Sequence, residues 1–74
     1  MPVIAKFCGI VIRILSLRAF GVRLLAFHGD AEMVVDLKTL RIVDGNLPEA
    51  IREMVLAWVR QHQQELLGGY WRTA

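Results

Sequence analysis

The chain has 74 residues, which is enough for one small domain, and its single cysteine, Cys8, excludes an internal disulfide. A net charge of +2 gives too little basic excess to indicate nucleic-acid binding by itself. No run approaches the ~18 apolar residues of a membrane-spanning helix, because Arg13, Arg18 and Arg23 interrupt the apolar segments, so we expect a soluble, cytoplasmic protein.

The first part of the chain predicts short strands. Side chains alternate over residues 3–7 and 10–15, and β-branched residues dominate the second run. Gly9 between these runs indicates either a bend or bulge in one long strand or a tight turn between two strands. Residues 16–22 predict a loop or a helical turn, because Gly21 makes a continuous helix unfavourable.

The next segment predicts further strands at residues 23–28, 32–37 and 41–43. The glycine–aspartate pair at 29–30 fits a two-residue turn of type II′, and a second turn is expected around 38–39. These strands and turns together predict an antiparallel meander with one face of the sheet under a helix.

A single amphipathic helix is predicted over residues 46–67. Asn46 is suited to cap its first turn, and Glu49 occupies the reciprocal position of a capping box. Gly68 and Gly69 are suited to end it in a left-handed conformation. One side of the helix carries the following residues: Ile51, Met54, Val55, Trp58, Val59, His62 and Leu66. The sequence therefore predicts one α+β domain over residues 1–74, an antiparallel meander of four to five short strands covered by one C-terminal amphipathic helix.

The candidate functional polar residues are His62 and His28. His62 lies on the apolar side of the helix, where it could be a ligand or a proton carrier. The favoured interpretation is a half-buried side chain that is hydrogen-bonded to a backbone carbonyl beneath the helix. His28 lies close in sequence to Asp30 and Glu32, in a pattern that suits an acid–base or metal cluster but is also common on solvated turns.

Two further residues with reactive or charged side chains are expected to have structural roles. Cys8, beside a predicted strand, is expected to be a small buried residue rather than a nucleophile. Asp36 is expected to form a surface ion pair with Lys38 or Arg41. No recognisable motif indicates a catalytic site, a cofactor or a metal.

The strand half holds most of the basic residues. Arg13, Arg18 and Arg23, together with Phe7, Phe20 and Phe27, suggest a nucleic-acid-binding face that combines phosphate contacts with stacking. The alternative is a solvated strand face with the phenylalanines in the core, and the slight basic excess favours that alternative.

The hydrophobic content, 55%, is high for so short a chain. The surplus apolar surface predicts a homo-oligomer or a small protein partner. Phe20 and Trp71 are candidate interface residues, whereas Trp58 is expected to anchor the core.

The whole chain resembles a small prokaryotic family, the domain-of-unknown-function family 4160. The matching residues are Pro2, Ile4, Phe7, Gly9, Ile12, Arg13, Gly29, Asp36, Gly45, Leu47, Pro48, Trp58, His62, Glu65, Leu66, Leu67 and Trp71. The resemblance implies an α+β fold and a gene often adjacent to one of another uncharacterised family, number 2442. Such a pairing implies a toxin–antitoxin-like or other operon-encoded partnership, and no established activity accompanies it.

The chain departs from that family between the second and third strands. Typical members carry a cluster resembling Asp-His-x-Pro-Pro-His-Phe-His, whereas residues 18–25 read RAFGVRLL. Ala19, Arg23 and Leu25 cannot replace imidazole ligands, so any metal or acid–base role of the cluster should be absent here. His62 matches a family position and His28 does not.

These observations predict a non-catalytic interaction module that self-associates or binds a protein partner in a toxin–antitoxin-like context. A nucleic-acid-binding component of such a pair is the second hypothesis, and a hydrolase using His28 or His62 is the third and weakest.

Overall fold

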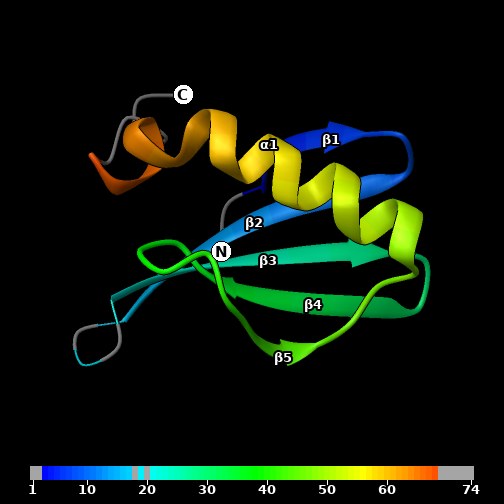
Figure 1. Cartoon of the computed structure of the whole chain (residues 1–74), viewed down its shortest axis with the longest axis horizontal. Helices are drawn as coiled ribbons and strands as arrows, with labels where there is room; N and C mark the ends of the chain where they lie inside the picture. Colours follow the sequence, from blue (N-terminus) through cyan, green and yellow to red (C-terminus); the bar gives the residue numbers. More distant parts are fainter. Residues whose placement is uncertain (1–2, 18, 20, 69–74) are drawn as a thin grey trace.

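The computed structural model describes residues 3–17, 19 and 21–68. The strands are β1 (Val3–Phe7), β2 (Ile10–Leu17), β3 (Gly21–His28), β4 (Ala31–Asp36) and β5 (Ile42–Gly45), and the helix is α1 (Glu49–Leu67). The strands form one antiparallel sheet in the order β1-β2-β3-β4-β5, and α1 lies across one face of it (Figure 1). This confirms the predicted α+β meander with a C-terminal helix.

The turn between β1 and β2 consists of Cys8 and Gly9, so Gly9 belongs to a tight turn rather than to a bend or bulge. Both residues have positive φ angles, 51° for Cys8 and 74° for Gly9. This suits the primed turns that join twisted strands. The expectation that Cys8 is buried was wrong, because a side chain at the tip of a hairpin points away from the core, and Cys8 is exposed.

The hairpin of β2 and β3 is longer than the sequence predicted. Ser16 pairs with Val22 and Leu17 pairs with Gly21, so most of the expected loop or helical turn is strand. Pairing with the neighbouring strand determines the conformation of these residues, and local propensity alone does not predict which strand a segment will pair with. Between the two strands the structure describes Ala19, which lies in a turn.

Asp36 organises the turn between β4 and β5. Its Oδ1 accepts hydrogen bonds from the backbone N–H groups of Lys38, at 2.8 Å, and Thr39, at 3.1 Å. Its Oδ2 lies 3.8 Å from Nε of Arg23, rather than beside Lys38 or Arg41 as expected. The expected pairing was wrong because Arg23 lies directly opposite Asp36 on the neighbouring strand.

The helix begins later than predicted. The residue in the N-cap position is Pro48, and the side chain of Asn46 instead accepts from the backbone N–H of Leu47, at 2.9 Å. The predicted capping box is therefore absent, because Asn46 lies too far from the first turn to reach it. At the other end Gly68 has a φ of −77°, so the predicted left-handed stop was wrong at this residue.

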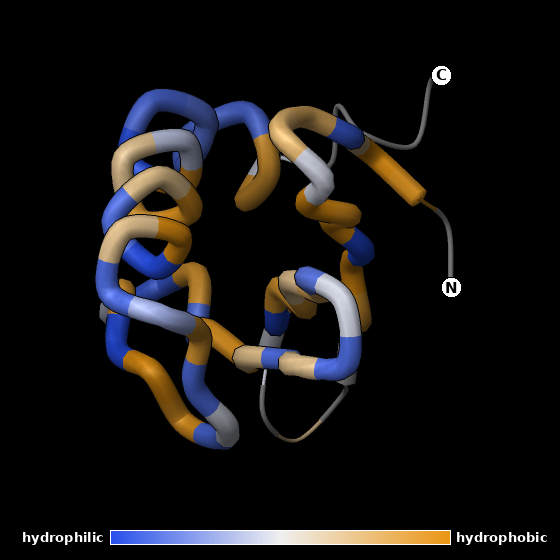
Figure 2. The backbone as a smooth tube through the Cα atoms, turned by 90° about the vertical axis from the view of Figure 1, so that its right-hand side faces the viewer, coloured by the Kyte–Doolittle hydropathy of each residue, from blue (hydrophilic) through white to orange (hydrophobic). Residues whose placement is uncertain are grey.

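The core lies between α1 and the sheet. Val55, Val59 and Leu66 of the helix are buried there, and Figure 2 shows α1 beside the sheet, with orange hydrophobic segments along the strands. Gln63 forms a hydrogen bond between the helix and the segment after β4, since its Nε2 donates to the carbonyl oxygen of Leu37 at 2.7 Å. Within the described part of the chain, no helix combines the length and the apolar character that crossing a bilayer requires.

Candidate functional site

The sheet has two faces of different character. The inner face packs under α1, and its side chains are fully or almost fully buried: Ile10, Ile12, Ile14, Leu24, Ala26, Met33 and Val35. Because alternate residues of a strand point to opposite sides, the intervening residues form a second surface, the outer face. The strand register assigns to it Val3, Lys6, Val11, Arg13, Leu15, Arg23, Leu25, Phe27, Glu32, Val34, Asp36 and Asp44.

The centre of the outer face is apolar. Val11 and Leu15 of β2 adjoin Leu25 and Phe27 of β3, with Val34 beside them on β4. All of these side chains are half-buried, and they do not belong to the core that packs against α1. A sheet face that only meets water normally carries polar residues at such positions, so this face has the composition of a contact surface.

Charged residues surround this apolar centre, with basic residues on one side of the sheet and acidic residues on the other. The basic side chains lie on the first three strands: Lys6 on β1, Arg13 on β2 and Arg23 on β3. The acidic side chains lie on the last two strands: Glu32 and Asp36 on β4 and Asp44 on β5. The outer face therefore has a basic half and an acidic half.

One ion pair marks the boundary between the halves. Arg23 and Asp36 are opposed across β3 and β4, and their side chains keep 24% and 19% of their exposure, respectively. The pKa of Asp36 lies below its ordinary value, chiefly because the carboxylate accepts a hydrogen bond from the backbone N–H of Thr39. The backbone N–H of Lys38 and the Arg23 guanidinium lower the pKa further, whereas partial desolvation acts in the opposite direction. Asp36 thus remains ionised at neutral pH and keeps its charge on the outer face.

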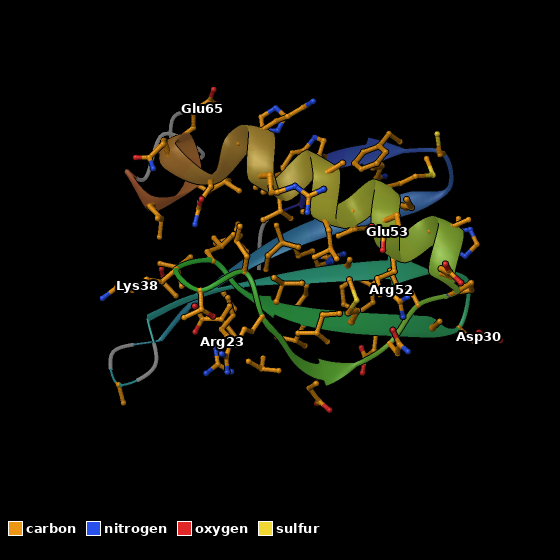
Figure 3. The ribbon with its side chains drawn as sticks, viewed as in Figure 1. Arg23, Asp30, Lys38, Arg52, Glu53 and Glu65 are labelled. Carbon is orange, nitrogen blue, oxygen red and sulfur yellow. The ribbon has the colours of Figure 1, made fainter. Side chains whose placement is uncertain are left out.

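Two of the candidate nucleic-acid-binding residues, Arg13 and Arg23, are described by the structure, and both lie in the basic half of the outer face. Arg13 and Arg23 share the outer face, but on different strands and in different rows of the ladder. Figure 3 shows Arg23 toward one end of the sheet, away from Asp30 at the opposite end. Arg18 lies outside the described residues.

His62 contacts its own helix and an aromatic ring. Its Nδ1 lies 2.8 Å from the carbonyl oxygen of Trp58, one turn earlier, and its ring stacks on that of Trp58 with centroids 4.3 Å apart. Phe7 of β1 continues the stack, with its centroid 6.0 Å from that of Trp58. The sequence correctly predicted a carbonyl partner for a half-buried histidine, but this carbonyl belongs to α1 rather than to the strands beneath it.

His28 lies at the end of β3 that meets the β1–β2 turn. A Cβ on Gly9 would lie 3.7 Å from Cδ2 and Nε2 of its imidazole, so the ring rests over the glycine. The structure does not bring His28, Asp30 and Glu32 together as a metal-binding group, and among the described residues no three such side chains are grouped in that way.

The candidate interface residues Phe20 and Trp71 both lie outside the described residues. The sequence did not lead us to predict the apolar centre of the outer face, which includes Leu15, Leu25, Phe27 and Val34. A signal was present, because β2 and β3 carry large apolar residues on both faces, whereas a half-exposed strand alternates apolar with polar.

The family model for a domain of unknown function, DUF4160, matches residues 24–71, which is well over half of the chain. No curated protein and no solved structure matches the chain significantly. The matched region contains most of β3, the strands β4 and β5 and the whole of α1. On this match, the chain belongs to the DUF4160 family of domains of unknown function.

Proposed function

We propose that this protein is a non-catalytic interaction module whose outer face binds another protein surface. The single observation that carries the proposal is the apolar centre of that face, where Leu25 and Phe27 stay half-buried on the side of the sheet away from α1. Burying apolar area is the dominant favourable term in most protein–protein association, and a charged rim around an apolar centre is typical of such interfaces. The partner is a second copy or a small protein, the latter in the toxin–antitoxin-like operon context that the family resemblance implies.

Nucleic-acid binding through Arg13, Arg18 and Arg23 is the weaker hypothesis. Glu32, Asp36 and Asp44 share the outer face with Arg13 and Arg23, and their carboxylates would repel a phosphate backbone. The aromatic side chain on this face, Phe27, is flanked in its row by Val11 and Glu32 rather than by further aromatic rings.

Site-specific photo-crosslinking in cells that make the protein tests the proposal. Leu25 on the outer face and Ala57, an exposed residue of α1, are each replaced by a photoreactive amino acid in otherwise identical chains. We expect an ultraviolet-dependent protein adduct at Leu25 and none at Ala57. The purified adduct partner must then bind the wild-type chain and fail to bind Leu25→Lys. Absence of an adduct at Leu25, or equal adducts at both positions, would contradict the proposal.

A further inference from the structure

We infer that the occupant of the outer face is the outer face of a second copy of this chain. The inference rests on the proposed function and names the partner. The two copies are related by a two-fold axis that runs parallel to the strands, between the two sheets. With the axis between β2 and β3, this operation sets β1 of one copy against β4 of the other and β2 against β3.

Charge complementarity selects the second copy and this orientation. The chosen axis places the basic Lys6 on β1 of each copy over the acidic Glu32 on β4 of the other, twice in the dimer. A two-fold axis perpendicular to the strands would instead place β1 over β1 and β5 over β5, with like charges opposed. Opposed like charges disfavour an interface, whereas complementary potentials fix its orientation. A closed two-fold contact of one self-complementary surface is also the commonest symmetry of protein oligomers.

The strand register identifies a pair of residues that meet at the rim. Lys6, Val11, Phe27 and Glu32 form one row across β1 to β4. With the axis between β2 and β3, the two ends of this row exchange places, so Lys6 of one copy faces Glu32 of the other. The same operation lays Val11 over Phe27, which keeps the apolar centre in contact with itself.

The size of the outer face fits a stable contact. The central strands have eight residues each, and the sheet has five strands. At about 3.4 Å per residue and 4.8 Å per strand spacing, the flat footprint of β1–β4, the strands that overlap in the dimer, is about 440 Å². The accessible surface of projecting side chains exceeds that footprint, which brings the face toward the roughly 600–1,000 Å² that each partner commonly buries.

The edges of the sheet are less suited to association than its face. The extra residue Ile4 interrupts the pairing of β1 with β2, and the extra residue Val43 does the same in β5. Bulges at sheet edges twist the unpaired strand away and oppose edge-to-edge addition. A second copy is therefore expected to bind the outer face of the sheet rather than its edges.

Charge reversal at the rim pair, followed by sedimentation equilibrium, tests this inference. We expect the wild-type chain to form a dimer, and Lys6→Glu and Glu32→Lys each to raise the dissociation constant roughly tenfold or more, because each variant opposes like charges twice. An equimolar mixture of these variants should restore dimerisation, since both rim contacts in the mixed dimer join opposite charges. The double variant K6E/E32K should also dimerise, since it exchanges the charges within one chain.

Glu53→Lys is the matched control, because Glu53 is exposed on α1 and the charge change is identical to that of Glu32→Lys. It should leave the dissociation constant unchanged. Circular dichroism of every variant should match the wild type, because Lys6 and Glu32 are both exposed. Equal weakening by Glu32→Lys and Glu53→Lys, or no restoration in the mixture, would overturn the inference.

Failure of this inference is distinguishable from failure of the proposed function. A wild-type chain that stays monomeric up to ~1 mM would exclude a second copy as the occupant. A crosslinked adduct at Leu25 with a different protein would then retain the proposed function while overturning the self-association. A crosslinked adduct at Leu25 with twice the mass of the chain would support both.

Discussion

The two faces of the sheet are built from the same strands and both carry large apolar residues, yet they differ in what covers them. Leu24 is fully buried beneath α1, whereas its neighbour Leu25 is half-buried on the outer face. Val35 and Val34 repeat the contrast on β4. The inner face supplies the core of the domain, and the outer face carries apolar residues that the core does not use. The inner-face residues therefore stabilise the fold, whereas the apolar residues of the outer face are available to contact a partner.

The largest expected effect comes from truncating the two adjacent leucines. Leu24→Ala should lower the free energy of unfolding by about 3 kcal/mol, because it removes buried methyl groups and leaves a cavity. Leu25→Ala should lower it by only about 1 kcal/mol in the monomer, because water already reaches that side chain. Urea denaturation at a protein concentration low enough to prevent association measures both. Equal losses would show that the outer face is as structural as the inner face.

Gly45 tests how β5, and with it the acidic Asp44, is held at the sheet edge. Gly45 has a φ of 68°, and an added Cβ would overlap the carbonyl oxygen of Glu32. Gly45→Ala should therefore cost more than about 2 kcal/mol, from backbone strain together with the overlap.

Gly29 is the matched control for that substitution. Its φ is 59°, but an added Cβ would have nothing within 4 Å. Gly29→Ala should cost about 1 kcal/mol, from the backbone conformation alone. Thermal unfolding of the two variants separates strain from overlap, and a Gly29→Ala cost equal to that of Gly45→Ala would refute the close approach of β5 to β4.

A smaller effect is expected at the boundary between the two charged halves. Asp36→Asn should destabilise the protein by about 0.5–1 kcal/mol at neutral pH, because it replaces a carboxylate that accepts backbone hydrogen bonds and pairs with Arg23. The native pKa of Asp36 is lowered from the ordinary value of 3.8. Its charge therefore stabilises the fold above pH 3.8, and this contribution disappears as the pH falls through the lower native pKa.

Urea denaturation of the wild type and Asp36→Asn across this pH range measures the effect. The difference in stability should be constant near neutral pH and shrink below pH 3.8. A difference that is independent of pH would mean that the carboxylate charge contributes nothing.

No effect is expected on nucleic-acid binding. The wild-type chain should not shift labelled RNA or DNA in a salt-dependent manner, and Arg13→Ala should leave this unchanged, because the carboxylates of the acidic half offset the arginines. Salt-sensitive binding that Arg13→Ala abolishes would instead make the basic half a nucleic-acid site.

The sequence predicted the covered side of the molecule better than the uncovered side. The period of α1 predicted its apolar side, from Ile51 to Leu66, and the alternation of residues 10–15 and 23–28 predicted strands, because burial beneath a helix imposes a regular pattern. The hairpin ends were harder, since the pairing of Ser16 with Val22 depends on a partner strand. Asn46 was misplaced as a cap because a good capping residue does not fix where the helix begins.

The candidate site was less accessible to sequence reasoning for a physical reason. Single-residue patterns identified the arginines and the histidines, but the separation of Lys6, Arg13 and Arg23 from Glu32, Asp36 and Asp44 is a property of strand order. It follows once the meander is known, because each half of the outer face comes from strands that are adjacent in the sheet. The resemblance supplied a family but no site, since Arg18 and the segment after it lack the histidine cluster of typical members.

The most direct test of the outer face as a contact surface is methyl nuclear magnetic resonance in the presence of a soluble paramagnetic agent. We expect the methyl signals of Val11, Leu25 and Val34 to be broadened in dilute protein and to become protected as the concentration rises. The signals of Leu24 and Val55 should stay protected throughout. Outer-face signals that respond to the agent equally at every concentration, or that are protected already in the dilute monomer, would contradict it.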